Sequence, residues 1–477
     1  MRHALIVIHL LAMPISAASE GPPELAGRWE GTLQVLEDQS TLKLVLRVTG
    51  KAPDYEAKLD SPEQGALGLW IDTLSVTPIP SAPGTAQVRW TLKKLGASFE
   101  GVLSSSPKAL TGKFTQAGSA MPLAFAYAGA DASVRRPQDP QKPYPYEEIT
   151  LAYKNPATGG TLAGTLTLPK GKGPFPAVVL ITGSGPQDRD ATIMGHRPFL
   201  VIADHLTRLG VAVLRVDDRS VGGSSGNLDT ATTADFATDV EAGLALLRTR
   251  AEVDPKRVGL LGHSEGALVA GLVASRTPDV AFVVLLGGPA VPGKQIVLAQ
   301  TALISRAQGV PEAVVAEQRR DQETLFGIIE TMKEPASRDQ ALDAAIRAAY
   351  ERQIKAIPGA PPIADAAVRQ QIRGLVTPWF RYFLSYDPRP ALTKVSCPTL
   401  ALIGEKDLQV PADENLAETR TAMAKNTNLT SRKLPGLNHL FQTAKTGSPK
   451  EYAGLDETFA PTALAMIGDW ILMHMKR

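Results

Sequence analysis

The feature that constrains this chain most is a Gly-x-Ser-x-Gly motif that joins an apolar run to an alanine-rich run. Residues 258–261 are apolar, the motif Gly-His-Ser-Glu-Gly centres on Ser264, and a helical pattern begins at once. A strand can turn into a helix this sharply only where glycines flank the turn, since larger side chains would make the two elements collide. The turn pushes the serine out above the sheet. Ser264 is therefore a candidate nucleophile.

The groups around such a serine should stabilise the negative charge that develops on the substrate during the reaction. The N-terminus of the following helix is positive, so the N–H of Glu265 is a candidate donor to a developing oxyanion. A second donor is expected from residues 183–190, Gly-Ser-Gly-Pro-Gln-Asp-Arg-Asp, after an early central strand. We choose Ser184 as that donor, and we expect Gly183 and Gly185 to lie against the substrate. This loop does not fit a dinucleotide fingerprint, because Asp188 replaces its third glycine.

A serine hydroxyl is a weak nucleophile and needs a base, which in turn needs an acid to orient it. In this architecture the chain order is serine, acid, histidine. Asp407 follows the apolar run 399–403, and it is favoured over Glu405 because it lies deeper in the loop. His439 is the single histidine between the strand-like run 429–434 and the C-terminal helical pattern, so we expect it to be the base.

Around these residues the chain alternates between short strands and helices. Strand candidates are residues 176–182, 211–216, 258–261, 280–286 and 399–403, several of them apolar throughout. Continuous apolar strands are typical of a parallel sheet that helices cover on both faces. The sequence therefore predicts an α/β core, built on a mostly parallel sheet, over residues 147–291 and 391–477.

Residues 292–390 interrupt that alternation with helical patterns alone. Ser337 and Gln340 form a plausible capping box for one of them. We expect a helical cap between two core strands. Near its end Trp379 and Phe383 belong to an aromatic cluster that either docks the cap or lines a substrate pocket. His196, further along the loop that starts at Gly183, either touches substrate or is a solvated helix start.

The first third of the chain has a different pattern. Residues 27–127 contain short runs of alternating apolar and polar residues separated by Gly, Pro and Ser, which indicates half-buried antiparallel strands. We expect a small all-β sandwich or barrel over residues 19–128. Residues 129–146 are rich in proline and polar residues, as extended linkers are.

Composition excludes several classes of function. Fifty Lys and Arg face 48 Asp and Glu, a net charge of +2 with no run of like charges, so a nucleic-acid partner is not expected. Cys397 is the only cysteine, which rules out an intrachain disulfide and thiolate-rich metal sites. No His-Glu-x-x-His spacing suggests a catalytic zinc. We expect no metal and no cofactor.

The N-terminus resembles an export signal. Arg2 precedes the apolar residues 4–15, and Ser16-Ala17-Ala18 supplies small residues for cleavage. The apolar stretch is too short to span a bilayer, and no later stretch reaches about 18 uninterrupted apolar residues. We expect residues 1–18 to be a signal peptide and the mature protein to be periplasmic or secreted, without stable membrane insertion. Oligomeric state leaves no signal in the sequence.

Taken together, the motifs resemble the α/β-hydrolase superfamily, and more narrowly exported bacterial carboxylesterases of the EstD type. The resemblance runs from about Glu147 to the C-terminus. It implies an esterase for small-molecule esters with short acyl chains, with Ser264, Asp407 and His439 at the triad positions. The family usually has glycine where this chain has Ser220, which predicts a differently bent loop. The motifs that carry the resemblance are residues 183–190, Asp217-Asp218-Arg219, residues 262–266 and residues 379–388.

The same machinery can also cleave thioesters, amides or peptides, so a thioesterase or serine peptidase is the alternative among enzymes. An envelope-binding protein with a vestigial hydrolase part is the alternative from another class.

Overall fold

The structure is a computed structural model that describes residues 24–34, 41–61, 66–116, 118–129, 136–354 and 362–475. The expected signal peptide, residues 1–18, and six residues of the expected linker lie outside this description. The chain forms two compact units, Met1–Ser133 and Val134–Arg477. The division falls within residues 129–146, where the sequence predicts the linker.

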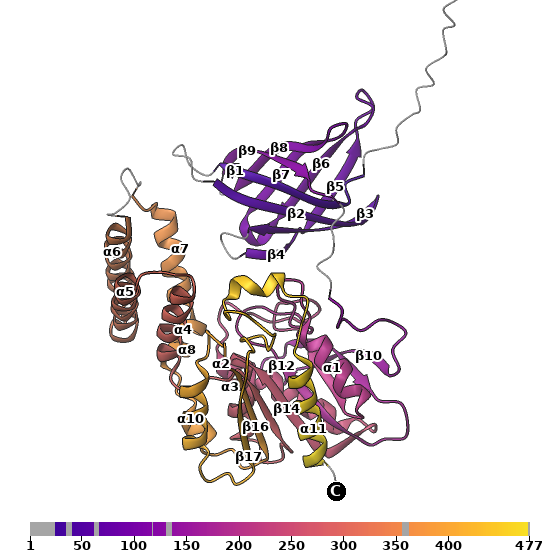
Figure 1. Ribbon diagram of the computed structural model, residues 1–477, viewed down its shortest axis with the longest axis vertical. Coiled ribbons are helices and arrows are strands. Elements are labelled where there is room, and N and C mark those ends of the chain that lie inside the picture. The colour runs from indigo at the N-terminus through magenta and orange to yellow at the C-terminus, as the bar shows by residue number, and fades with distance from the viewer. Residues whose placement is uncertain are drawn as a thin grey trace, which may run out of the picture. The chain divides into compact units, whose positions relative to one another are not determined.

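The N-terminal unit is one antiparallel sheet of nine strands in the order β4-β3-β2-β1-β9-β8-β7-β6-β5 (Figure 1). Burial alternates along β1 and β6, as expected for strands with one face in a core. That core includes Trp29, Trp90 and Phe99. The strands are β1 (Gly27–Gln34), β2 (Thr41–Lys51), β3 (Asp54–Ser61), β4 (Ala66–Trp70), β5 (Thr73–Pro78), β6 (Thr85–Leu92), β7 (Ala97–Ser105), β8 (Lys108–Gln116) and β9 (Ser119–Tyr127).

The C-terminal unit is built on an eight-stranded sheet in the order β10-β11-β13-β12-β14-β15-β16-β17. Strands β12 to β17 pair in parallel, as the apolar runs predict. Strands β10 and β11 form an antiparallel edge that those runs do not indicate. The strands are β10 (Glu147–Lys154), β11 (Thr161–Leu168), β12 (Phe175–Ile181), β13 (Ala212–Val216), β14 (Val253–His263), β15 (Val283–Leu286), β16 (Thr399–Gly404) and β17 (Leu429–Leu434).

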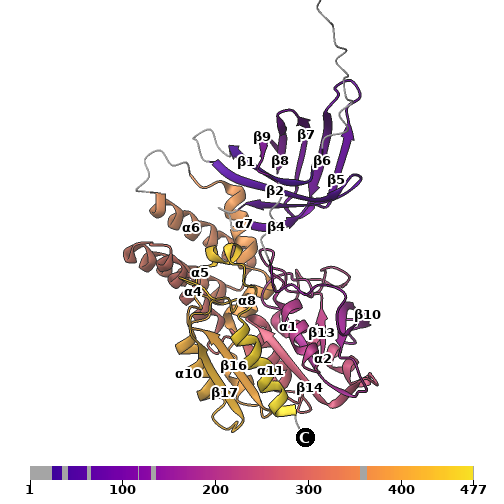
Figure 2. The same cartoon turned by 45° about the vertical axis from the view of Figure 1, so that its right-hand side comes forward.

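Helices cover both faces of this sheet (Figure 2). Along β12, Val178 and Leu180 join one hydrophobic cluster while Val179 and Ile181 join the other, which is why the strand is apolar throughout. The first cluster includes residues of α1 (Pro198–Arg208) and α11 (Pro461–Met475). The second includes residues of α2 (Thr233–Thr249), α3 (Glu265–Ala274) and α10 (Ala412–Ala422).

Between β15 and β16 the described residues form helices alone: α4 (Gly293–Ala307), α5 (Glu312–Thr331), α6 (Pro335–Ile354), α7 (Asp365–Leu375), α8 (Pro378–Ser385) and α9 (Arg389–Leu392). The expected capping box is wrong. Helix α6 begins before Ser337, and the carboxylate of Glu334 accepts the N–H groups of Ala336 and Ser337. None of the helices in the described ranges is both long enough and apolar enough to cross a membrane.

Candidate active site

Ser264 occupies a strained turn between β14 and α3. Its backbone angles are φ 56° and ψ −120°, a region that residues other than glycine rarely adopt. A Cβ at Gly262 would collide with the carbonyl oxygen of Gly266, and a Cβ at Gly266 would collide with that of Ile181. The two glycines of the motif are therefore required by the close approach of strand, turn and helix, as the sequence predicts.

Asp407 and His439 meet at the ends of β16 and β17. Oδ2 of Asp407 lies 2.8 Å from Nδ1 of His439, and its Oδ1 accepts the N–H groups of Gln409 and Val410, each at 2.8 Å. Asp407 is 4% exposed and His439 is 3% exposed. The competing acid Glu405 is exposed and accepts the N–H of Gly436 instead. The structure thus brings Asp407, and not Glu405, to His439.

His439 also lies against the residue that precedes the serine. Nε2 of His263 donates to the backbone carbonyl of His439 at 2.8 Å, and the two rings lie 4.8 Å apart between centroids. Burial lowers the pKa of His263 to about 4, so its ring is a neutral donor at neutral pH. This bond ties the loop that carries His439 to the turn that carries Ser264. The sequence gives no signal for this positioning role of His263, although the residue stands inside the motif.

The loop after β12 passes close to Ser264. A Cβ at Gly183 would lie 3.2 Å from Cβ of Ser264, so the loop runs against the side chain of the serine. Ser184 and Gly185, the next residues of the loop, are exposed. Within the described ranges, neither the N–H of Ser184 nor that of Glu265 donates to a backbone carbonyl. Both predicted oxyanion donors are therefore free of backbone partners beside the serine.

Two aspartates after β13 hold this loop in place. The carboxylate of Asp218 accepts the hydroxyl of Thr182 at 2.6 Å and the N–H of Gln187 at 2.9 Å. Its neighbour Asp217 pairs with the guanidinium of Arg189 at 2.6 Å. In the sequence these residues only mark the resemblance to the family, and nothing in their spacing predicts that they brace the loop.

The position after these aspartates keeps the geometry that glycine allows. Ser220 has a φ of 62°, in the left-handed region, and its hydroxyl donates to the carbonyl of Gly226 at 2.7 Å. Ser220 therefore adopts the backbone conformation that glycine favours, and the turn keeps its shape. The sequence-based expectation of a differently bent loop does not follow from this substitution.

The side chain of Glu265 connects three elements. Its Oε1 accepts the hydroxyl of Thr233 from α2 at 2.6 Å and the indole N–H of Trp379 from α8 at 2.8 Å. Burial raises the pKa of Glu265 above its ordinary value. Trp379 stacks on Phe383 with ring centroids 5.5 Å apart, and Phe383 is buried in the core cluster of the sheet. These aromatics therefore dock the helical segment, and Trp379 also reaches the residue next to the nucleophile.

His196 lies away from this group. The ring is 1% exposed, with Nδ1 3.0 Å from the hydroxyl of Thr458 and Nε2 2.8 Å from the carbonyl of Tyr452. The alternative of a solvated helix start is wrong because the ring is buried. The hydrogen-bond partners of His196 belong to the segment before the C-terminal helix, and none of them is Ser264. Contact between His196 and substrate therefore stays a prediction.

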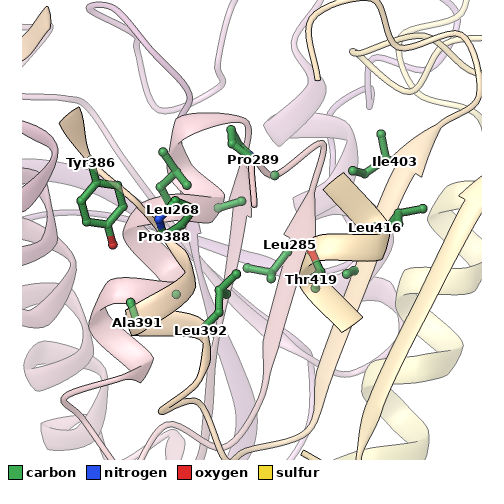
Figure 3. A pocket seen from close by; sticks show the side chains of 14 residues that line it. Leu268, Leu285, Pro289, Tyr386, Pro388, Ala391, Leu392, Ile403, Leu416 and Thr419 are labelled. Atoms are coloured by element: carbon green, nitrogen blue, oxygen red, sulfur yellow. The ribbon is translucent and has the colours of Figure 1, made fainter. Parts of the chain in front are cut away.

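A small apolar cavity lies between α3, α9 and α10 (Figure 3). Its volume is about 10 Å³, counted as space open to the centres of water molecules, which is room for about one water. Leu268, Leu285 and Leu392 are among its walls, and none of Ser264, Asp407 and His439 is. The cavity is too small and too apolar to hold an ester.

Parts of this chain are similar to known proteins. The esterase EstD of Thermotoga maritima is 37% identical over 135 residues, which are 28% of this chain and 32% of that protein. The match thus spans about a third of the length of this curated relative. An esterase of Pyrococcus furiosus aligns over 69% of this chain and 92% of its own with 16% identity and a TM-score of 0.43. For the α/β hydrolase GrgF of a Penicillium species these values are 69%, 99%, 16% and 0.44.

A family model described as "Alpha/beta hydrolase family" matches residues 178–455, more than half of the chain. This span includes the strained turn at Ser264, the loop after β12, and both Asp407 and His439. The chain therefore belongs to the alpha/beta hydrolase family.

Proposed function

We propose that this protein hydrolyses carboxylic esters with short acyl chains through a triad of Ser264, His439 and Asp407. Two observations carry the proposal: the buried hydrogen bond between Asp407 and His439, and the strained strand-to-helix turn that holds Ser264. His263, the residue before Ser264, links the two because its ring binds the backbone carbonyl of His439. The similarity to a protein named an esterase supports esters as the substrate class. The preference for short chains rests on the resemblance seen in the sequence.

In the first half of the reaction Nε2 of His439 takes the proton of the Ser264 hydroxyl while Oγ attacks the ester carbonyl carbon. The carbonyl oxygen becomes an oxyanion, which accepts the N–H groups of Ser184 and Glu265. The tetrahedral intermediate collapses, the bond to the alcohol oxygen breaks, and the imidazolium gives its proton to the leaving alcohol. An acyl-enzyme on Ser264 remains.

In the second half a water molecule attacks the acyl carbon, and His439 takes its proton. Collapse of the second intermediate breaks the bond to Oγ, and His439 returns the proton to Ser264. Asp407 stays ionised and accepts the Nδ1–H of His439, which keeps Nε2 free as the base and stabilises the imidazolium. A group transfer to water needs no further reactant.

The helical segment 292–390 would serve as a cap over this site. Trp379 supports that assignment, because its indole N–H binds the side chain of the residue that supplies an oxyanion donor. Closure of a site by such an element excludes water and strengthens the electrostatic contacts within it.

The test is labelling by a fluorophosphonate together with hydrolysis of nitrophenyl esters of increasing acyl length. We expect wild type to be labelled and to prefer short chains. In Ser264→Ala we expect no labelling, and kcat should fall about 10⁴-fold or more. Ser275→Ala is the matched control: its hydroxyl caps the end of the same helix on the carbonyl of Leu272, so activity should be retained.

The remaining outcomes separate the alternatives. Turnover of acyl-CoA faster than of nitrophenyl esters would indicate a thioesterase instead of an esterase. Turnover of aminoacyl anilides faster than of these esters would indicate a peptidase. A folded wild-type protein that neither reacts with the label nor turns over any substrate would support the binding protein.

A further inference from the structure

A second cavity lies beside the nucleophile turn, among β12, β13, α2 and α3. Its volume is about 60 Å³ by the same measure, which is room for about four water molecules. Much of the wall is apolar and includes Val179, Val216, Phe236 and Val240. Unlike the cavity in Figure 3, it can hold the end of an alkyl chain together with a polar head.

This cavity borders the candidate active site. Gly183 forms part of its wall, and a Cβ on that residue would lie 3.2 Å from Cβ of Ser264. Glu265, whose N–H is a proposed oxyanion donor, is also in the wall. The cavity wall thus contains two neighbours of Ser264: Gly183, which contacts its side chain, and Glu265, which follows it in the chain.

The cavity wall has an excess of carboxyl groups. Four of them, from Asp217, Asp218, Asp239 and Glu265, face a single guanidinium, that of Arg219. Asp239 pairs with Arg219, and Asp217 pairs with Arg189. For Asp218 and Glu265 the partners are neutral hydroxyl, indole and backbone donors. Two carboxyl groups of the wall thus lack a cation among the described residues.

Two buried polar atoms of the same wall lack hydrogen bonds. Oη of Tyr153 and Oε2 of Glu265 are buried and make no hydrogen bond of normal geometry in the part of the chain described. The hydroxyl of Ser184 lies close enough to the Glu265 carboxyl to lower its pKa, but it is neutral and brings no charge. Glu265 as a whole is 2% exposed. Buried polar groups are nearly always hydrogen-bonded, so unpaired ones at a cavity indicate that a ligand or water completes them. Burial also raises the pKa of Asp218 to about 7, as expected for a carboxyl with no cation nearby.

We propose that this cavity is a subsite for a primary alkylammonium group. An ammonium brings a positive charge and three N–H donors, which suit two carboxyl groups that have no cation beside them and a phenolic oxygen. Its methylenes suit the apolar wall. A neutral alcohol offers one donor and no charge, and a carboxylate would be repelled. The ammonium has two possible sources: an ester substrate that carries its own amine, which rests on the proposed function, or a free alkylamine.

The first experiment compares methyl 6-aminohexanoate with methyl heptanoate at neutral pH. These esters differ in a terminal ammonium against a methyl group. If the substrate supplies the amine, we expect wild type to favour the amine ester by tenfold or more in kcat/KM. Glu265→Gln should reduce this ratio to about twofold or less. The ratio is taken within each variant, so a general loss of rate does not disturb it.

Two further variants make the comparison decisive. Tyr153→Phe removes the unpaired hydroxyl and keeps the ring, and it should lower the ratio severalfold even if the Glu265 variant fails to fold. Glu241→Gln is the matched control, because Glu241 lies on α2 and pairs with Arg276 outside the cavity, and its replacement removes an equal charge. The ratio should stay at its wild-type value in this control.

The second experiment titrates wild type with n-butylammonium chloride by calorimetry, with tetramethylammonium chloride as the salt control. If the substrate supplies the amine, butylammonium binds and competes with the amine ester. If a free amine is the ligand, butylammonium binds and changes the rate of methyl heptanoate hydrolysis until the site is saturated. In that case wild type hydrolyses the two esters with equal kcat/KM. Either effect must weaken in Glu265→Gln.

The two proposals can fail separately. Hydrolysis of both esters at equal rates, with no heat from butylammonium, would overturn the subsite and leave the esterase standing. Absence of any hydrolysis would count against the esterase, and the calorimetric titration would still decide the subsite.

Discussion

The two units differ most in the polar groups that they bury. In the described part of the N-terminal unit the buried polar residues are Asp60 and Ser61, and Asp60 binds Arg47 at 2.7 Å. The C-terminal unit buries many more, among them Asp217, Glu265 and His439. Burial of a polar group is unfavourable unless hydrogen bonds compensate it. Among the described residues, buried polar groups are therefore concentrated in the C-terminal unit, whereas the core of the N-terminal unit is almost wholly apolar.

The strongest test of this difference between the units is to replace one buried carboxylate of the C-terminal unit. Asp407→Asn should lower kcat on the best ester about 10⁴-fold, because an asparagine at this position can no longer hold the His439 tautomer that leaves Nε2 free. Steady-state kinetics on the folded variant measure this. Glu405→Gln, two residues away on an exposed side chain, should change kcat less than about twofold. Equal losses in the two variants would refute the assignment of the acid.

The largest effect in the N-terminal unit should be on stability alone. Trp90 is 1% exposed and stacks on Phe99 with centroids 5.5 Å apart. Trp90→Ala should lower the free energy of unfolding of this unit by about 3–5 kcal/mol. Calorimetric unfolding of the full chain measures it.

The control for that variant is another tryptophan of the same sheet. Trp70 is 56% exposed, and its ring lies 4.3 Å from the ammonium of Lys58. Trp70→Ala should cost about 1 kcal/mol or less. Neither variant should change kcat. A loss of kcat in Trp90→Ala at a temperature where both units stay folded would show that the division between stability and chemistry is wrong.

The parallel strands and the motif residues could be predicted because their signals are local. The apolar runs at β12 and β16 follow from burial on both faces, and the turn at Ser264 follows from glycines two residues to either side. Chain order then gave Asp407 and His439, and the structure joins them.

The contacts that brace the site could not be predicted because they join residues far apart in the chain. His263 and His439 are 176 residues apart, and Glu265 and Trp379 are 114 apart. No pattern of spacing specifies such pairs. The antiparallel strand β10 was missed for another reason: it alternates between half-buried and exposed residues and contains no continuous apolar run.

The last prediction separates two adjacent aspartates of the C-terminal unit by the pH dependence of stability. Burial raises the pKa of Asp218 to about 7. Burial acts the same way on Asp217, but hydrogen bonds from Arg189 and from backbone N–H groups lower the pKa of Asp217 overall. A raised carboxyl pKa gives stability that is present below the unfolded value and lost as pH rises through the folded value. A lowered one gives stability that is lost only in more acidic solution.

Between about pH 4 and pH 7 the Asp218 contribution should therefore remove up to about 4 kcal/mol from the free energy of unfolding of this unit. Asp218→Asn should flatten the profile in this window, because asparagine does not titrate. Denaturant unfolding at a series of pH values measures the slope. Asp229→Asn, an exposed residue of the loop after β13, should leave the slope unchanged. A profile as steep in Asp218→Asn as in wild type would mean that this carboxyl is already ionised at pH 4, like its neighbour.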